Sequence, residues 1–340
     1  MPPPLPTPDL DAILDATAPL WPEMRNQRLF LTGGTGFFGC WLVESFLHIN
    51  RALQLDASLT VLTRNPEAFL SKLPHLRHHE NLTLLEGDVR TFTFPPDPYD
   101  FILHAATEAS ARQLAEQPGE MRSTILDGTS RVLAFAASAN TRKLLFTSSG
   151  AVYGPQPAAL AHFPEDVPPA PATLYAEAKL AAEQLCAHAA SPTLQIKIAR
   201  CFAFLGPHLP LHTHFAAGNF LADALAGRPI RIASDGASVR SYLYAADLAI
   251  WLWTMLFRAT SLRPCNVGSE DAVSIRELAA AVVSAVNPAI AVEIAQIPNP
   301  TQPPHRYLPS TVRAQTELNL RQNVSLQDAL RRTAAWHRLK

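Results

Sequence analysis

Short apolar runs alternate with longer segments of helical period between residues 28 and 206. The runs that predict β-strands span residues 29–31, 59–63, 82–86, 101–105, 143–148 and 194–201. The clearest helical patterns between them span residues 37–49, 120–137 and 173–189. Strands that alternate with helices in this way form a parallel sheet with helices on both faces. The pattern therefore predicts an α/β fold with a doubly wound parallel sheet.

The rest of the chain forms two further parts. After residue 206 the alternation loosens into helical patterns at 215–226, 246–257, 275–286 and 324–337, with a short strand at 230–232. We expect residues 207–340 to form a smaller C-terminal α/β lobe for substrate, with some segments returning to the sheet domain. Five of the thirty prolines lie in residues 1–8, which predicts an extended arm on the surface or in solvent before a short helix at 9–16. This arm and helix make up residues 1–27.

Composition excludes several classes of protein. Twenty-eight Lys and Arg face 29 Asp and Glu, so a basic groove for nucleic acid is not expected. The longest apolar run, at 250–257, is too short to span a bilayer, and the N-terminus lacks the pattern of a signal peptide. The four cysteines lie far apart without a CxxC pair, which favours a reduced compartment over a disulfide scaffold. We therefore expect a cytoplasmic protein with no nucleic-acid or membrane partner and no metal site.

A glycine-rich turn follows the first predicted strand and opens the first helix. It reads Thr-Gly-Gly-Thr-Gly-Phe-Phe-Gly at 32–39. Gly33 allows a tight turn, Gly36 lets the backbone approach a pyrophosphate, and Gly39 lets helix and strand pack closely. The helix N-terminus adds free N–H groups for the anion. The turn, including Thr35, Phe37 and Phe38, identifies residues 28–206 as a Rossmann-like NAD(P)-binding domain.

The end of the second strand distinguishes the two nicotinamide cofactors. An acidic residue there holds the ribose 2′-OH of NAD, whereas an arginine accommodates the 2′-phosphate of NADP. This chain has Arg64 and no acid, which favours NADP over NAD; stacking of Arg64 on adenine and a solvated loop position are the alternatives. Asp88 and Val89, after the third strand, are placed to hold the adenine ring, although Asp88 is also suited to cap a turn.

Three side chains predict acid–base chemistry. Tyr175 and Lys179 are four residues apart on a predicted helix and share one face. A nearby ammonium favours the phenolate and lowers the tyrosine pKa, as a general acid/base near neutral pH requires. Ser149 lies at the carboxyl end of a predicted strand, where doubly wound sheets bind ligands.

With these motifs the chain resembles the extended short-chain dehydrogenase/reductase family, which modifies nucleotide sugars. The resemblance covers residues 28–338 and rests on TGGTGFFG at 32–39, HAA at 104–106, TSSGAVYG at 147–154, YAEAK at 175–179, RCFAFLGP at 200–207 and VRSYLYAADLA at 239–249. It implies that Tyr175 exchanges a proton with the sugar, that Lys179 also holds the nicotinamide ribose, and that Ser149 hydrogen-bonds the reacting oxygen. Further cofactor contacts are implied for Ala105, Ala106, Thr107, Thr147, Cys201 and Phe202.

The resemblance also implies substrate contacts. Arg240 matches an arginine that grips the diphosphate, and guanidinium groups form paired hydrogen bonds with phosphate oxygens. Asn219 matches another diphosphate contact. Arg306 lies where a second clamping arginine is often found, with a solvated loop charge as the alternative. Glu108 follows the fourth strand and either binds the sugar, serves as an auxiliary acid or points to solvent.

Departures from the family pattern reduce the number of reactions that the resemblance implies. The 4,6-dehydratases resembling this chain carry Asp and Glu where it has Gly150 and Ala151, and the related decarboxylases keep the Glu. A 4-epimerase needs neither, and the same holds for a 4-ketoreductase, because hydride transfer at one carbon and a tyrosine proton relay suffice. Ala203 replaces a family asparagine, and Ile125 replaces another.

These features favour an NAD(P)-dependent enzyme that acts on a nucleotide-diphosphate sugar, most simply as a 4-epimerase and alternatively as a 4-ketoreductase. A reductase of a non-nucleotide substrate and a non-catalytic dinucleotide-binding protein are the competing hypotheses. Alanine-rich helices at 120–137 and 173–189 resemble those that pair in the dimers of many relatives, so we expect a homodimer.

Overall fold

The computed structural model describes residues 2–107, 118–212, 215–297 and 303–339. Its centre is a parallel sheet of seven strands in the order β11-β6-β5-β4-β1-β2-β3. The strands are β1 (Arg28–Thr32), β2 (Ser58–Thr63), β3 (Leu82–Glu86), β4 (Phe101–His104), β5 (Lys143–Ser149), β6 (Gln195–Cys201) and β11 (Cys265–Val267). The strand order reverses between β1 and β4, which creates a crevice at the carboxyl ends of these strands.

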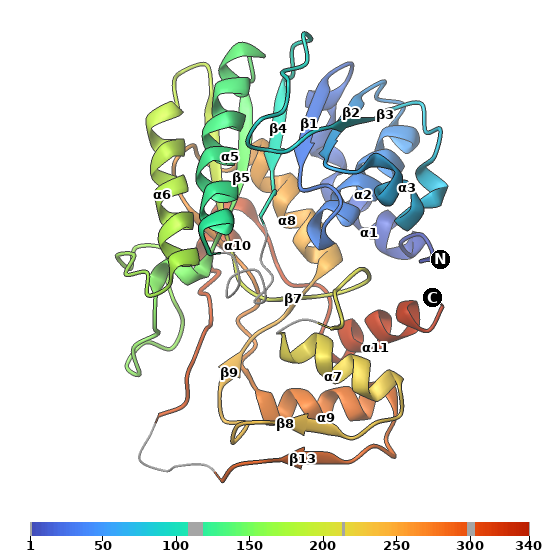
Figure 1. Ribbon diagram of the computed structural model, residues 1–340, viewed down its shortest axis with the longest axis vertical. Coiled ribbons are helices and arrows are strands. Elements are labelled where there is room, and N and C mark those ends of the chain that lie inside the picture. The colour runs from blue at the N-terminus through green and yellow to red at the C-terminus, as the bar shows by residue number, and fades with distance from the viewer. Residues whose placement is uncertain (1, 108–117, 213–214, 298–302, 340) are drawn as a thin grey trace.

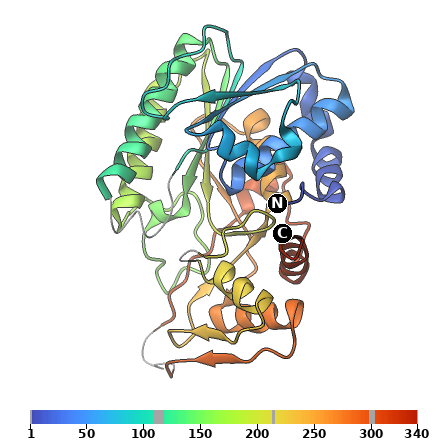
Figure 2. The ribbon, with the colours of Figure 1, turned by 45° about the vertical axis from the view of Figure 1, so that its right-hand side comes forward.

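Helices cover both faces of the sheet, as Figures 1 and 2 show. One face carries α5 (Pro118–Ser138) and α6 (Leu174–Ala189), which pack side by side. The other carries α2 (Phe37–Leu53) and α8 (Ala245–Arg258), with α1 (Thr7–Thr17) packed on both. Every residue of β4 is buried, because strands covered on both faces are apolar throughout rather than alternating. The predicted doubly wound α/β fold is confirmed.

A smaller group of elements lies below the sheet in Figure 1. Its helices are α7 (Ala216–Leu225), α9 (Ile275–Val286) and α11 (Leu326–His337), and both α7 and α11 pack on α9. Three pairs of short strands complete it: β8 (Ile230–Ile232) with β13 (Val292–Ile294), β9 (Val239–Arg240) with β12 (Val273–Ser274), and β7 (Phe204–Leu205) with β10 (Leu243–Tyr244). Between these elements the chain returns to the sheet through α8, β11 and α10 (Val312–Leu318).

The N-terminal arm is anchored rather than free in solvent. Residues 2–6 have no regular structure, as expected, but Leu5 is buried and its N–H donates to Glu44 of α2 at 2.9 Å. The indole of Trp336 in α11 donates to the Pro4 carbonyl oxygen at 3.1 Å. In α1, buried Asp9 accepts a hydrogen bond from Tyr244 at 2.6 Å. The arm is therefore fixed to α2 and α11, and the two ends of the chain lie close together in Figure 2.

Several short elements were not predicted. These are α3 (Pro66–Lys72), α10, the strands β7, β9, β10, β11, β12 and β13, and the 3₁₀ turns η1 (Ala18–Met24), η2 (Pro74–Leu76) and η3 (Gly150–Tyr153). The unpredicted strands are two or three residues long, too short for a repeating pattern to identify them. They form because partners distant in the sequence supply their hydrogen bonds.

Candidate active site

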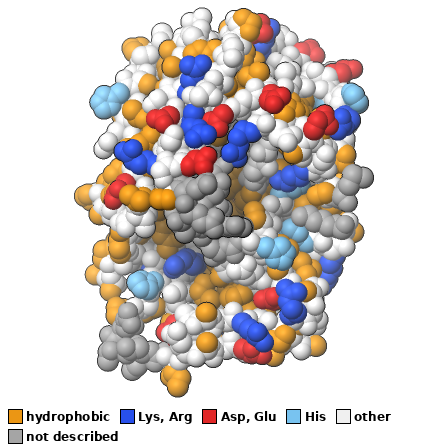
Figure 3. Space-filling model, viewed as in Figure 1, with side chains coloured by type: hydrophobic (Ala, Val, Ile, Leu, Met, Phe, Trp, Pro, Cys, Tyr) orange, Lys and Arg blue, Asp and Glu red, His pale blue; other side chains and the backbone are white. Residues whose placement is uncertain are grey.

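A cavity of about 680 Å³ opens at the carboxyl end of the sheet, where the strand order reverses. Figure 3 shows this face of the molecule, hollowed between the sheet domain and the smaller lobe, with hydrophobic side chains visible in the hollow. Its lining includes most of the predicted site residues: Gly33, Thr35, Gly36, Phe37, Phe38, Arg64, Asp88, Val89, Ala105, Ala106, Thr107, Thr147, Ser149, Tyr175, Lys179, Cys201 and Phe202. One cavity thus brings together residues from both halves of the sheet.

The glycine-rich turn forms one end of the cavity. Gly33 has a φ of 75°, a left-handed conformation that L side chains rarely adopt, and the Gly36 N–H donates to its carbonyl oxygen at 3.1 Å. Gly39 is packed so closely that an added Cβ would lie 2.3 Å from the Gly33 carbonyl oxygen. Gly36 is the N-cap of α2 and carries no capping side chain, so the first N–H groups of α2 remain available to an anion. The turn therefore fits the pyrophosphate of a dinucleotide.

Lys72 in α3 supports this turn from its outer side. Its ammonium donates to the carbonyl oxygen of Thr35 at 2.8 Å. The contact fixes one peptide of the turn and brings a positive charge close to the anion-binding end of α2. The sequence analysis missed Lys72, because nothing local indicates that α3 returns to the turn.

Arg64 and Asp88 lie at the far side of the same end. Arg64 is exposed and lines the cavity directly after β2. The Asp88 carboxylate is held by the Arg90 guanidinium through two contacts of 2.8 Å, and this hydrogen bonding lowers the pKa of Asp88 to about 2. Asp88 also accepts a hydrogen bond from the Arg90 N–H at 2.9 Å, so it does cap a turn. An ionised acid and an arginine therefore both lie at the end of the cavity that is expected to hold the adenosine.

His104 fixes the backbone where β4 meets the cavity. Its ring bonds the Thr32 hydroxyl at 2.7 Å and the Thr129 hydroxyl at 3.1 Å. Thr32 in turn accepts a hydrogen bond from the Ala106 N–H at 3.2 Å. Burial lowers the pKa of His104 to about 3, so the imidazole is neutral. His104 is therefore structural, and it sets the position of the 105–107 backbone.

Strand β5 and helix α6 bring the three predicted catalytic side chains to one wall. Ser149 ends β5, and Tyr175 and Lys179 lie one turn apart on α6. The Lys179 ammonium donates to the Thr107 hydroxyl at 2.6 Å and to the Thr147 carbonyl oxygen at 2.8 Å. It lies 6.0 Å from the centre of the Tyr175 ring. A substrate oxygen placed between Ser149 and Tyr175 would thus have two hydroxyl partners.

Burial controls the ionisation of this group. It raises the pKa of Tyr175 to about 12, while a hydrogen bond with Ser149 acts in the opposite direction. It also lowers the pKa of Lys179 to about 8. The expectation that Lys179 lowers the pKa of Tyr175 does not hold in this structure, because its ammonium is directed at Thr107 and Thr147 and burial is the larger effect.

A buried ion pair supports the wall from behind. Glu183 of α6 accepts two hydrogen bonds from Arg200 of β6, at 3.0 and 2.7 Å, and one from the Ser148 hydroxyl at 2.5 Å. The pair ties α6, β5 and β6 together next to the predicted catalytic side chains. Tyr153 packs under Arg200 at 4.8 Å and stacks on Phe163 with ring centres 4.8 Å apart. Tyr153 is therefore a structural aromatic.

The predicted diphosphate contacts lie outside the cavity lining. Arg240 donates to the carbonyl oxygens of Val239 and His305, at 2.8 and 3.3 Å. Arg306 and Asn219 are not among the lining residues either, and Glu108 lies outside the described part of the chain. Gly39 also lies behind the lining, where it packs against the turn.

Two tyrosines that the sequence analysis missed line the substrate side of the cavity. Tyr242 precedes β10, and Tyr307 lies in the 303–311 segment next to Arg306. Tyr242 lies in the motif VRSYLYAADLA at 239–249, so the sequence did contain a pattern that could have indicated it. Tyr307 has no local signal, because its segment reaches the cavity only through contacts with distant strands.

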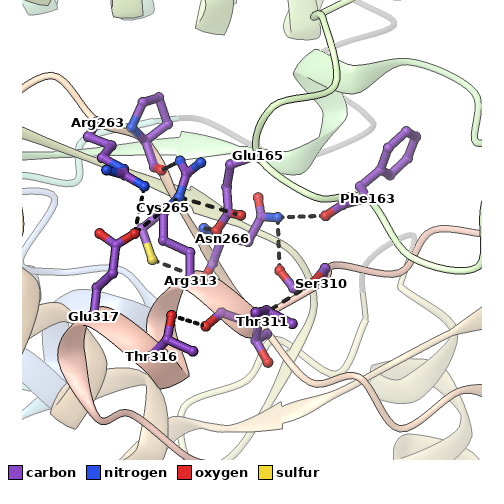
Figure 4. Close-up of polar contacts among 12 residues, drawn as sticks. Phe163, Glu165, Arg263, Cys265, Asn266, Ser310, Thr311, Arg313, Thr316 and Glu317 are labelled. Atoms are coloured by element: carbon purple, nitrogen blue, oxygen red, sulfur yellow. Dashed lines mark hydrogen bonds and ion pairs between the residues drawn. The ribbon is translucent and has the colours of Figure 1, made fainter.

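Figure 4 shows how the end of that segment is anchored. The side-chain amide of Asn266 in β11 donates to the carbonyl oxygens of Phe163 and Ser310, at 2.7 and 3.0 Å. The Asn266 N–H donates to Glu165 at 2.9 Å, and Glu165 lies 3.8 Å from the Arg313 guanidinium. These polar contacts fix residue 310 against the sheet edge and thereby limit the movement of Tyr307.

In the described ranges, no group of three or more His, Cys, Asp or Glu is arranged to hold a metal ion. His208 is buried 3.5 Å from Glu44, and its ring lies 4.5 Å from that of Trp336. Among the helices described, none is long and apolar enough to cross a membrane.

The chain is similar to known enzymes whose names refer to sugar nucleotides. UDP-glucuronic acid decarboxylase 1 of Arabidopsis thaliana is 28% identical over 317 residues, which cover 91% of this chain and 69% of the relative. The structure of UDP-N-acetylglucosamine 4-epimerase from Methanobrevibacter ruminantium superposes with a TM-score of 0.79 at 22% identity, covering 93% of this chain and 99% of the other. UDP-glucose 4-epimerase of Thermus thermophilus, solved with NAD, gives 0.75 at 25% identity, covering 92% and 99%.

The family assignment rests on a match over most of the chain. The model of the NAD dependent epimerase/dehydratase family matches residues 29–271, which include the glycine-rich turn, Ser149, Tyr175, Lys179 and Arg240. This agrees with the resemblance to extended short-chain dehydrogenases/reductases drawn from the motifs. The chain therefore belongs to the NAD-dependent epimerase/dehydratase family.

Proposed function

We propose that this chain is a nucleotide-sugar 4-epimerase that uses Ser149, Tyr175 and Lys179. The observation that carries the proposal is the convergence of these side chains on one wall of a cavity that continues to the glycine-rich turn. The turn can hold a dinucleotide pyrophosphate, and the wall can hold a secondary alcohol or ketone. A bound nicotinamide would supply the hydride acceptor and donor.

The protein residues move the proton. Tyr175 as phenolate removes the proton of the sugar 4-OH while the hydride leaves C4, which gives a 4-keto sugar. Ser149 donates a hydrogen bond to the reacting oxygen. Lys179, held by Thr107 and Thr147 one turn from Tyr175, would hold the ribose of the bound nicotinamide. Return of the proton from Tyr175 to the oxygen, with hydride supplied to the opposite face of the ketone, would complete epimerisation.

The residues after Ser149 support this reaction over elimination or decarboxylation. Gly150 and Ala151 carry no acid or base, and Ala151 lines the cavity. In the described lining, the only Lys or Arg side chains are Lys179 and Arg64, at the catalytic wall and the adenosine end. A sugar carboxylate would find neither a partner cation on the described substrate side nor an auxiliary glutamate at position 151. An uncharged hexose fits better, and a 4-ketoreductase is the alternative with the same residues.

The position of Arg240 favours a second candidate function. Its guanidinium is bonded to backbone carbonyl groups and lies behind Tyr307, at 6.0 Å from that ring. Ala203 stands where the family has an asparagine. A reductase of a carbonyl substrate without a diphosphate would leave Arg240 unused. Substitution Arg240→Ala separates the two, because a diphosphate substrate should lose roughly 10-fold or more in kcat/KM and the other substrate should lose nothing.

Two further proposals concern the cofactor and the assembly. We propose that Arg64, which is exposed beside the cavity, binds the 2′-phosphate of NADP. We also propose a homodimer through α5 and α6, which lie side by side on one face of the sheet. Light scattering at micromolar concentration would contradict the dimer if it gave the mass of one chain.

The function is tested by product analysis. The purified protein is denatured and any released dinucleotide is identified by mass spectrometry, and intact protein is incubated with a panel of UDP- and dTDP-hexoses. Retained cofactor and a change of configuration at C4 without net oxidation would support an epimerase, whereas stoichiometric oxidation of NADPH by a 4-keto sugar would make it a reductase. Tyr175→Phe should lower turnover about 100-fold or more. Tyr99→Phe is the matched control, since this buried phenol bonds Thr60 in β2 away from the cavity.

A further inference from the structure

Gly150 lies between two residues that line the cavity, Ser149 and Ala151, but it is not itself part of the lining. It is buried, and the ring of Phe202 packs against it. A Cβ built on Gly150 would lie 2.4, 2.5 and 2.7 Å from the Cζ, Cε2 and Cε1 atoms of this ring. Phe202 lines the cavity and is half-buried. The ring therefore covers residue 150 on the side of the cavity.

The register of the sheet brings this ring to the wall that carries Ser149. Ser149 at the end of β5 and Cys201 at the end of β6 are partners in the parallel register. The residues that follow them, Gly150 and Phe202, therefore leave the edge of the sheet side by side. An aromatic surface thus lies one residue beyond Ser149, where the proposed mechanism places the reacting oxygen.

The base of the Phe202 side chain is fixed by its surroundings. The Phe202 N–H donates to the carbonyl oxygen of Val267 in β11 at 3.0 Å. A Cβ built on Gly268 would lie 3.2 Å from the Phe202 Cβ, which is closer than ordinary van der Waals contact. The ring packs on that of Tyr307, with centres 4.6 Å apart and planes inclined by 32°. Because the open side of the ring is the cavity, pressure from residue 150 would move its tip in that direction.

The backbone at residue 150 gives no other reason for a glycine. The φ of Gly150 lies outside the left-handed region, so alanine would meet no backbone strain there. Gly154, which ends the same short turn η3, differs in this respect, because its φ is 76°. The packing of Phe202 is thus what excludes a side chain at residue 150.

We propose that Phe202 is a specificity-determining residue, which keeps residue 150 without a side chain and supplies the surface on which the sugar ring packs beside Ser149. The proposal rests on the proposed function, because the sugar is the occupant. One face of a hexose carries apolar C–H groups, which pack well on an aromatic ring. An acid at residue 150, where the 4,6-dehydratases that this chain resembles carry Asp, would have to displace the ring. Packing therefore excludes the acid that elimination requires.

The first test is thermal unfolding with NAD⁺ or NADP⁺ present, and it uses no sugar. Gly150→Ala should lower the unfolding midpoint by roughly 1–4 °C, because the Phe202 ring has to shift by about 1 Å. Phe202→Leu keeps the side chain as far as its δ carbons and removes the three atoms nearest residue 150. In that background Gly150→Ala should leave the midpoint unchanged.

The matched control is Phe204→Leu, which makes the same replacement in the same cavity lining. The Phe204 ring packs on Phe38, with centres 5.0 Å apart, and is not among the atoms nearest Gly150. Gly150→Ala should therefore lower the midpoint as much in the Phe204→Leu background as in the wild type.

The second test is calorimetric titration with UDP-glucose and with UDP, again with cofactor present. With the ring displaced into the cavity, Gly150→Ala should bind UDP-glucose roughly 10-fold more weakly and bind UDP as the wild type does. In the Phe202→Leu background, Gly150→Ala should leave the affinity for UDP-glucose unchanged. Equal losses for UDP and UDP-glucose, or an unchanged affinity for both in Gly150→Ala, would overturn the role of Phe202 in sugar binding.

The unfolding cycle decides the packing separately from the sugar. An equal shift of the midpoint by Gly150→Ala with and without Phe202→Leu would overturn the proposal. If Gly150→Ala alone does not fold, a folded double variant with Phe202→Leu supports the packing and an unfolded one contradicts it. A wild type that binds neither UDP nor UDP-glucose would refute the proposed function and the sugar as occupant, whereas the cycle would still decide whether Phe202 excludes a side chain at residue 150.

Discussion

Gly39 and Gly36 lie three residues apart in the same turn, yet substitution by alanine should have a different main effect at each. It should lower the stability of the fold at Gly39 and weaken cofactor binding at Gly36. A Cβ on Gly39 would lie 2.3 Å from three backbone atoms, the Gly33 carbonyl oxygen and two atoms of Gly34. Backbone atoms cannot rotate away, so α2 and the turn would have to separate by roughly 1 Å to restore ordinary van der Waals contact. Overpacking of this kind costs about 1–3 kcal/mol, and the rigid surroundings place Gly39→Ala near the upper end.

Gly36→Ala meets no such obstacle in the folded protein. The nearest atom to its Cβ is the Gly33 carbonyl oxygen at 3.4 Å, and Gly36 has an extended backbone with φ −79° that alanine adopts easily. Its cost is the loss of a favourable N-cap, about 1 kcal/mol or less. The added methyl group would stand where the pyrophosphate approaches the turn. Cofactor affinity should therefore fall by roughly 10- to 100-fold, while the fold is retained.

The two variants are compared by thermal unfolding without cofactor and by calorimetric titration with NAD⁺ and NADP⁺. For a chain of 340 residues, a loss of about 2–3 kcal/mol lowers the unfolding midpoint by roughly 3–4 °C. We expect that shift for Gly39→Ala and a smaller one for Gly36→Ala. Wild-type affinity in Gly36→Ala would refute the placement of the pyrophosphate, and wild-type stability in Gly39→Ala would refute the close packing of α2 on the turn.

Three further predictions test other parts of the structure. Arg64→Ser should weaken NADP⁺ binding about 10-fold or more and leave NAD⁺ binding unchanged in calorimetry. Leu5→Ala should lower the free energy of unfolding in urea by about 2–3 kcal/mol, because Leu5 is buried, and an unchanged value would mean that the arm is not anchored. Burial lowers the pKa of Lys179 from 10.5 to about 8, so the unfolded chain binds more protons between these values and stability should rise with pH there. Lys179→Met should reduce that rise, and an identical pH dependence would contradict the burial argument.

Sequence patterns predicted the elements whose determinants are local. Helix α9 begins and ends at the predicted residues. Its start is fixed by a local signal, because Ser274 and Glu277 form a capping box there. The central strands were predicted for a similar reason, since strands buried on both faces are apolar throughout. Strand β11 was missed because it has three residues and exists through its pairing with β6. Its place in the sheet is set by tertiary contacts that no local pattern contains.

The same distinction between local patterns and tertiary contacts applies to the residues of the candidate site. The glycine-rich turn, Ser149 and the pair Tyr175 and Lys179 each follow a strand or lie on one helix face, so local spacing predicted where they meet. Tyr307 reaches the cavity because its segment bonds to β9 and to the loop at residue 163, which are far away in the sequence. Family position alone instead indicates its neighbour Arg306 as a substrate contact, and Arg306 does not line the cavity.

The ionisation of Tyr175 depends both on residues predicted from local spacing and on contacts between segments distant in the sequence. Spacing on α6 correctly put Lys179 one turn from Tyr175, but it could not indicate that the ammonium would be drawn to Thr107 and Thr147 at 2.6 and 2.8 Å. Since burial then raises the pKa of Tyr175 to about 12, a tyrosine–lysine pair alone does not supply a base near neutral pH in this structure. The remaining stabilisation of the phenolate must come from hydrogen-bond donors at the wall and from positive charge brought closer when the cavity is filled. Ser149, at the end of β5 on the same wall, is a hydroxyl that acts to lower the pKa of Tyr175.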